Sequence, residues 1–379
     1  MSHSMNWDMT PFFPAFGSAE MTAFRDGLAG DIAALTLRAT NTAGLTAETA
    51  QAWDEIFRAQ ETLYARYTHF LCYLDCLGAA DARNEAVHAE TGRLATIDAA
   101  LQKLDVEFKR SLKTVSDEVF QAFIERREMA PIAYHLTRQR EDARHTMERE
   151  LEVLAADLGV NGFSSWGRLY NTIAGKLEFA MLYPDGRREM KSMAQRQALM
   201  EDADPKIRRA AFEGGNAAWE AYADVCAAAL NHLAGTRLTL NDRRGVGHYL
   251  DVALFQARVS RRTVDAMMKA AAGGRDLCRR FAGIKAGWLK LPGLAWYDIE
   301  APLPVSDGLK YEWTGGVDMV AKSFGRVFPE FGTFLADILN RRWVDAEPRP
   351  GRRPGAFCTG SPLIEEQRIF MTFEGSFGD

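Results

Sequence analysis

WDEIFRAQETLYARYTHFLCYL, residues 53–74, carries the strongest helical periodicity in the chain. Its large apolar side chains recur at spacings of three and four, which places them on one face of a helix. The pattern runs from Ala47 to Leu77, and a second segment with the same spacing extends from Leu94 to Leu112. We therefore predict an antiparallel helical hairpin, joined by a turn at residues 77–81, within an N-terminal helical subdomain over residues 1–115.

Helical patterns also dominate the rest of the chain, with one clear interruption. An Asp185-Gly186 pair separates two short runs at residues 176–183 and 187–193, and this arrangement predicts a β-hairpin because glycine tolerates positive φ. Further helices are expected to end at Gly159 and to begin at Pro205 and Ser260. The sequence thus predicts a mainly α, multi-helix fold with a small β-sheet. We place a helical linker region with the hairpin at residues 116–200 and a third region at residues 201–379.

Three finer expectations concern this third region. The apolar residues of the helix after Pro205, at residues 207–233, mark a buried face, and Gly214-Gly215 inside it indicates a kink or a close helix contact. The segment from Ser260 to Trp288 is expected to form one long helix. Residues 295–304, which contain two prolines, are expected to be extended.

Composition limits the class of protein. The 379 residues carry a net charge of -5, so electrostatics give no reason to expect a nucleic-acid partner. No apolar run approaches the roughly 18 residues that a membrane-spanning helix needs, and the first residues lack the features of a signal peptide. Five sparse cysteines do not suggest a disulfide framework. We expect a soluble, cytoplasmic protein with no membrane partner. The basic cluster of Arg349, Arg352 and Arg353 lies among prolines and glycines and is expected to be a solvated loop rather than a phosphate site.

The tail combines a loop and a strand. It reads RRWVDAEPRPGRRPGAFCTGSPLIEEQRIFMTFEGSFGD from Arg341 to Asp379. Residues 368–373 are β-branched, aromatic and bounded by turn residues, which predicts a short strand. An edge strand exposes backbone N–H and C=O groups that can pair with an extended peptide.

This tail resembles the thimet oligopeptidase/oligoendopeptidase F family of zinc metallopeptidases. In that family a Gly-Ala-Phe/Tyr-Cys loop, here Gly355 to Cys358, and an edge strand precede a zinc-binding H-E-x-x-H helix. The similarity is co-linear over nearly the whole chain. It includes Trp7-Asp8 and the segments at residues 199–212, 280–286 and 296–303.

The resemblance implies a zinc-dependent endopeptidase that acts on oligopeptides, in which metal-bound water attacks the scissile carbonyl. Residues 201–379 would then be the front part of a helical, zincin-like catalytic domain. No H-E-x-x-H sequence occurs in the chain, and we expect the zinc helix to lie beyond Asp379. We therefore predict that these 379 residues alone contain no catalytic or metal-ligating residue of the family, bind no zinc and are inactive. The expected partners are an oligopeptide and either the C-terminal half of the same polypeptide or a second copy. The alternative is a non-catalytic helical peptide-binding or interaction protein, a truncated or degenerate relative.

Two other chemistries are less favoured. His69, Cys72 and Cys76 share a helical face with ligand-like spacing, but a tetrahedral metal site needs a fourth ligand that the sequence does not supply. Cys358 on its loop could be a nucleophile only with a base such as His248 nearby, and nothing in the sequence places it there.

The family's strand and loop give the candidate substrate-binding residues. They are Gly355, Ala356, Phe357, Arg368, Phe370, Met371, Thr372, Phe373, Glu374 and Gly375.

Overall fold

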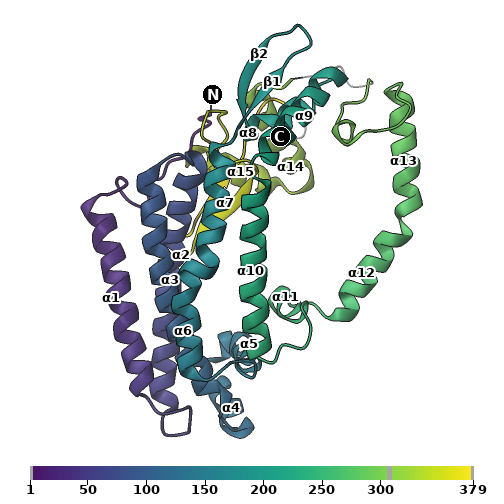
Figure 1. The fold of residues 1–379 in the computed structure, drawn as a ribbon. Coiled ribbons are helices and arrows are strands. Elements are labelled where there is room, and N and C mark those ends of the chain that lie inside the picture. The colour runs from purple at the N-terminus through teal and green to yellow at the C-terminus, as the bar shows by residue number, and fades with distance from the viewer. Residues whose placement is uncertain (1–2, 305–309, 377–379) are drawn as a thin grey trace.

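The computed structural model describes residues 3–304 and 310–376, and it is mainly α (Figure 1). Three long antiparallel helices, α1 (Ala19–Asn41), α2 (Ala50–Ala80) and α3 (Glu85–Lys113), form the N-terminal bundle. Their apolar stripes meet in one large core, which confirms the predicted helical hairpin of α2 and α3. Asn84 sets the start of α3 because its side chain accepts hydrogen bonds from two backbone N–H groups of the first turn.

The next helices close one side of this bundle. They are α4 (Asp117–Ile124), α5 (Ala133–Ala143), α6 (Arg149–Gly159) and α7 (Ser165–Lys176). The α-helix α6 ends at Gly159 as predicted, but the helical path does not stop there, since a π-helical turn at Val160–Ser164 carries α6 directly into α7. Gly159 keeps a right-handed helical φ of -59° instead of the left-handed conformation of a helix-ending glycine.

The β-hairpin is confirmed as β1 (Glu178–Leu182) paired with β2 (Arg188–Ser192). It is followed by α8 (Met193–Met200), α9 (Pro205–Glu220) and α10 (Ala223–Arg243). Gly214 lies inside the straight helix α9, where an added Cβ would be 2.7 Å from the carbonyl oxygen of Ala180. The glycine pair thus marks close contacts, of Gly214 with the hairpin and of Gly215 with the Arg196 side chain on α8, and the helix breaks later, between α9 and α10.

The predicted buried face of this segment is only partly correct. Ala211 is fully buried, but Leu230 on α10 is 67% exposed, and Ala229 is the one buried residue of that helix. Nothing among the described residues covers the outer side of α10, so its apolar side chains face solvent.

The expected long helix after Ser260 is two helices. A short α11 (Asp251–Ala257) precedes α12 (Arg261–Gly273) and α13 (Arg275–Trp288), which are separated at Gly274. Residues 295–304 are not extended throughout, because Trp296–Asp298 forms a 3-10 turn. The Asp298 carboxylate fixes this turn: it accepts from the Ala295 N–H and pairs with the buried guanidinium of Arg208 at 2.7 Å.

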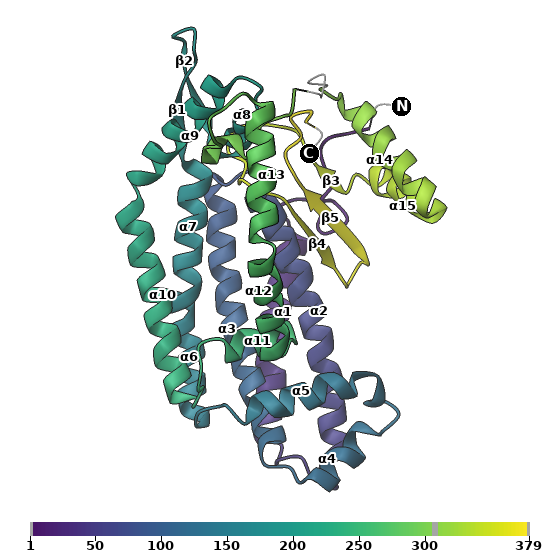
Figure 2. The same ribbon diagram turned by 90° about the vertical axis from the view of Figure 1, so that its right-hand side faces the viewer.

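The C-terminal part has two helices and a three-stranded sheet. Helices α14 (Trp313–Val327) and α15 (Pro329–Asn340) lead into β3 (Val344–Asp345), β4 (Phe357–Ser361) and β5 (Glu366–Phe370). The strand order is β3-β5-β4, with β5 parallel to β3 and antiparallel to β4 (Figure 2). Within residues 3–304 and 310–376, no helix is both long and apolar enough to cross a membrane.

Candidate functional site

The strand expected to lie at an edge is paired on both sides at its C-terminal end. β5 is the middle strand, and Ile369 and Phe370 are paired on both sides, so the edge-strand prediction is wrong for Phe370, whereas residues 366–368 are paired with β4 alone. The sequence could not reveal this because β3 is only two residues long. Beyond Phe370 the pairing with β4 ends, because β4 begins at Phe357, opposite Phe370. Residues 371–373 therefore have a strand partner on one side only among the described residues.

Backbone hydrogen bonds identify the open side. Ile369, Met371 and Phe373 donate their N–H groups to carbonyl oxygens within residues 343–346, at 2.9–3.0 Å. Peptide groups alternate in direction along a strand, so the N–H of Thr372 points toward the side that β4 leaves uncovered. The Thr372 hydroxyl is buried and has no hydrogen-bond partner. One unpaired backbone edge thus remains within the predicted site.

The loop before β4 lies at the same end of the sheet. Gly355 has a φ of +95°, which only glycine adopts without strain, and it is exposed together with Ala356. Phe357 is half-buried and stacks on Phe370, with ring centroids 5.2 Å apart. The structure therefore brings the loop residues next to the end of β5, as the resemblance implies.

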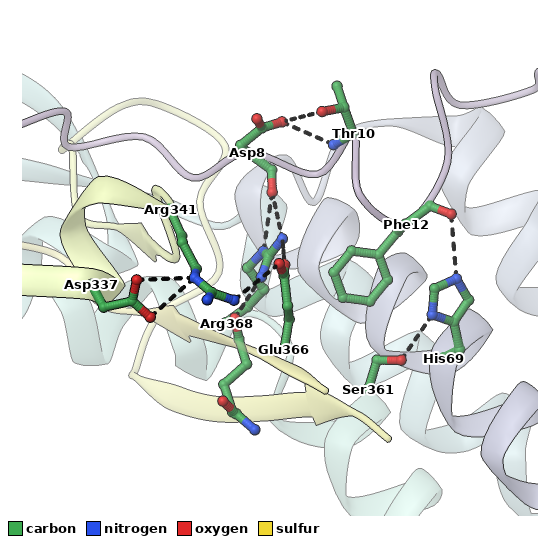
Figure 3. A network of polar contacts seen from close by, with 10 residues as sticks. Asp8, Thr10, Phe12, His69, Asp337, Arg341, Ser361, Glu366 and Arg368 are labelled. Carbon is green, nitrogen blue, oxygen red and sulfur yellow. Dashed lines mark hydrogen bonds and ion pairs between the residues drawn. The ribbon is translucent and has the colours of Figure 1, made fainter. Parts of the chain in front are cut away.

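Arg368 and Phe370 contribute differently from their neighbours, because both side chains are fully buried. The Arg368 guanidinium donates to the backbone carbonyl of Asp8 at 2.7 and 3.1 Å and pairs with Glu366 at 2.9 Å (Figure 3). Phe370 packs in the core of the N-terminal bundle, close to Trp7. These two side chains fasten the sheet to the N-terminal segment and are not at the surface.

The basic cluster in the loop is also structural, and the expectation of a solvated loop is wrong for Arg352. Its side chain is fully buried and lies 3.0 Å from the carboxylate of Asp345, which is itself fully buried. Arg349 pairs with the same carboxylate at 2.6 Å. Arg352 also donates to the backbone carbonyls of Asp345 and Met371. Two guanidinium groups and one carboxylate thus hold the loop against the start of the open edge.

His69 bridges two distant segments rather than facing open space. One ring nitrogen lies 2.8 Å from the Ser361 hydroxyl and the other 3.3 Å from the Phe12 carbonyl oxygen (Figure 3). Burial lowers the pKa of His69 and so favours the neutral ring. Because both nitrogens have protein partners, the geometry offers no free metal ligand here, and Cys72 and Cys76 are buried beside it.

Cys358 is exposed on β4, while His248 contacts its own neighbours, Leu250 and Tyr249. The described residues contain no contact between Cys358 and His248. Across residues 3–304 and 310–376, there is also no group of three or more His, Cys, Asp or Glu side chains that could hold a metal ion. The residues present therefore do not fit a zinc site, and no catalytic step through zinc is assigned to them.

A large cavity that the sequence does not reveal lies among the helices, away from the three-stranded sheet. It has a volume of about 1160 Å³ and is bounded by α3, α5, α6, α10 and α11. Its walls carry ion pairs such as Arg244–Glu152 at 2.6 Å. Burial opposes ionisation of Glu152, but the bonds from Arg244 and from the Met147 N–H hold the pKa of this carboxyl below its ordinary value. No local motif signals this cavity, because its lining comes from five separate helices.

Comparison with known proteins shows which proteins the chain resembles. A family model described as oligopeptidase F matches residues 112–179. The oligopeptidase PepF of Bacillus subtilis is 22% identical over 330 residues, which cover 84% of this chain and 48% of that protein. The chain thus spans about half the length of this curated relative.

Two solved structures share the fold. An oligoendopeptidase F from Enterococcus faecium aligns with a TM-score of 0.64 and 16% identity, over 83% of this chain and 60% of that one. A PZ peptidase A solved with an inhibitor aligns with a TM-score of 0.72 and 14% identity, over 93% and 60%.

The chain therefore shares the mainly α, helical fold of these solved peptidases. Together with the family model and the curated relative, this likeness supports an oligoendopeptidase F-like family member.

Proposed function

We propose that this chain is the substrate-handling part of a zinc-dependent oligoendopeptidase of the F type, acting on oligopeptides in the cytoplasm. The proposal rests on the family relationship and on one feature of the site, the unpaired edge at Met371–Phe373. The zinc and its ligands would belong to the complete enzyme, and the described residues alone supply none. No observation favours the alternative of a non-catalytic interaction protein. The three regions at residues 1–115, 116–200 and 201–379 remain the proposed domain division.

The open edge is suited to pairing with an extended peptide. An added strand gains affinity from main-chain hydrogen bonds, while its alternate side chains reach neighbouring pockets. The Thr372 N–H and the exposed loop residues Gly355 and Ala356 lie where such a strand would run. Arg352 and Asp345 keep this backbone in place from the other side. Met371, Phe373, Glu374 and Gly375 complete the proposed binding segment.

Thr372→Pro tests this edge. Proline removes the N–H that points to the open side, so binding of a fluorescently labelled oligopeptide, followed by anisotropy, is expected to be lost at an unchanged melting temperature. Thr372→Ala keeps the N–H and is the matched control, expected to bind as the original chain does. Mass spectrometry of the same mixtures should find the peptide intact, with or without added zinc. Equal binding by both variants would remove the edge from the proposal.

We propose further that a C-terminal half, or a second copy, covers apolar surface on α14 and α15. Phe324, Phe328, Phe331 and Phe334 are each about half exposed. Exposed apolar patches larger than a few hundred Å² are unusual on soluble monomers.

A hydrophobic dye should therefore fluoresce with the 379-residue chain and lose this signal when the C-terminal half of a relative is added. Light scattering should report either a complex or self-association. A chain that stays monomeric and dye-silent at high concentration would contradict this partner.

A further inference from the structure

The segment from Arg261 to Lys290, which contains α12 and α13, forms a helical arm that packs against almost nothing in this chain. Figure 1 shows it standing apart from the bundle and from α10. No residue of α12 is buried, and Ala286 is the only buried residue of α13. The arm nonetheless has well-formed helices, with a Ser260 side chain that caps the start of α12.

The arm differs from the rest of the molecule in charge. It carries eight Lys or Arg side chains and two Asp, a net charge of +6, in a chain whose total is -5. Most of these cations have no carboxylate partner within the part of the chain that the structure describes. The two ion pairs on the arm, Arg261–Asp265 and Arg279–Asp276, are local and solvent-exposed. The arm therefore projects a positive field from an otherwise acidic protein.

An apolar stripe runs along α13 between two of these cations. Leu277, Phe281, Ile284 and Trp288 follow each other at spacings of four, three and four, and each is about half exposed or more. Arg280 borders one edge of the stripe, since it is three residues from Leu277 and four from Ile284. Lys285 borders the other edge in the same way, between Phe281 and Trp288, where its ammonium also donates to the Ile299 carbonyl oxygen and keeps its positive charge. The pattern is an apolar seam with a cation on each flank.

We propose that the arm is a docking surface for an acidic amphipathic helix on a partner polypeptide. The seam spans three helical turns, the length over which side chains of two helices interlock. Its flanking cations correspond to the positions at which paired helices exchange ion pairs, and they require carboxylates on the partner. The solved relatives extend well beyond the part that this chain covers, so polypeptide that could supply such a helix exists in proteins of this fold. This surface is separate from the edge at Thr372 and does not depend on peptide handling there.

The test uses the whole 379-residue chain and a labelled synthetic peptide. The peptide is helical, with leucines at three- and four-residue spacing and glutamates on both flanks. Anisotropy should report saturable binding that weakens with salt. A peptide of the same composition in scrambled order, and one with lysine in place of glutamate, should not bind.

Matched variants locate the binding. Phe281→Ala and Arg280→Glu should each weaken it about tenfold, because one removes a central apolar anchor and the other reverses a flanking charge. Phe324→Ala and Lys322→Glu make the same changes on exposed positions of α14 and should leave binding unchanged. Circular dichroism should be unaffected in all four variants, since none of these side chains is buried.

Three results would overturn the proposal. The first is loss of peptide binding only in the α14 variants. The second is no peptide binding together with tight binding to vesicles of anionic phospholipid, which would make the arm a membrane contact. The third is no peptide binding together with a dimer that Arg280→Glu dissociates, which would make the occupant a second copy.

Discussion

Helices α2 and α13 have nearly the same apolar spacing but opposite surroundings. On α2, Trp53 and Phe70 are fully buried against α1, α3 and the N-terminal segment. On α13, Phe281 is 63% exposed, and its neighbours in the stripe also face solvent. Periodicity predicts that a helix has an apolar face, but it does not say whether the same chain supplies the element that covers that face. The apolar face of α2 is covered by other parts of this chain, whereas α10 and α12–α15 leave much of their apolar surface open among the described residues.

The largest expected contrast comes from truncating matched aromatic side chains. Trp53→Ala should lower the free energy of unfolding by about 3–5 kcal/mol, because it leaves a cavity in a packed core. Phe281→Ala should change this free energy by less than about 0.5 kcal/mol. Urea unfolding followed by circular dichroism measures both. Similar losses for the two variants would contradict this contrast, because they would mean that α13 is covered in solution.

Ion pairs offer a second contrast, between the buried carboxylate of Asp345 and the exposed carboxylate of Asp276 on the arm. Asp345→Asn should destabilise the protein by about 3–5 kcal/mol, since it leaves the buried guanidinium of Arg352 without its counter-charge. Asp276→Asn should have no measurable effect, because its pair with Arg279 is solvated. Thermal unfolding at low and high salt distinguishes them. The Asp345 variant should be destabilised to a similar extent at both salt concentrations, because salt screens buried charges little, and a stable Asp345 variant would contradict the prediction.

Two glycine substitutions, one in α9 and one between α12 and α13, should change the free energy of unfolding by smaller amounts and in opposite directions. Gly214→Ala in α9 should cost about 1–3 kcal/mol, because the new Cβ would collide with the Ala180 carbonyl oxygen. Gly274→Ala between α12 and α13 should stabilise the chain by about 0.4–1 kcal/mol. Its φ of -78° suits alanine, and the nearest atom to the new Cβ would be 3.5 Å away. Denaturant midpoints for the pair measure the difference. A destabilising Gly274→Ala would show that the junction needs flexibility.

The sequence predicts local structure better than it predicts contacts between segments that are distant in the chain. The α2–α3 hairpin and the Asp185-Gly186 turn follow from spacing and turn chemistry, and both are confirmed. The burial of Arg352 and Arg368 does not follow from the sequence. The Arg352 side chain is buried through its contacts with the sheet, and the Arg368 side chain through a group that is distant in the chain. For Arg368 that group is the Asp8 carbonyl, 360 residues away. The central position of β5 was missed for the same reason, since its order in the sheet depends on a two-residue strand. The substrate-binding residues stay a prediction, which the unpaired backbone edge at Met371–Phe373 makes testable.

The meeting of the two ends of the chain has a consequence for how the protein folds during synthesis. The Met5 carbonyl accepts the Ala346 N–H at 2.7 Å, and the Asp8 N–H donates to the Arg342 carbonyl at 2.7 Å. Phe370 occupies a core formed by residues made more than two hundred positions earlier. Helices α1–α3 can form as they leave the ribosome, but their core keeps a gap until β5 arrives. The N-terminal segment must therefore wait, unpaired, until more than three hundred further residues have been made, and closing that large loop should be a slow step of folding.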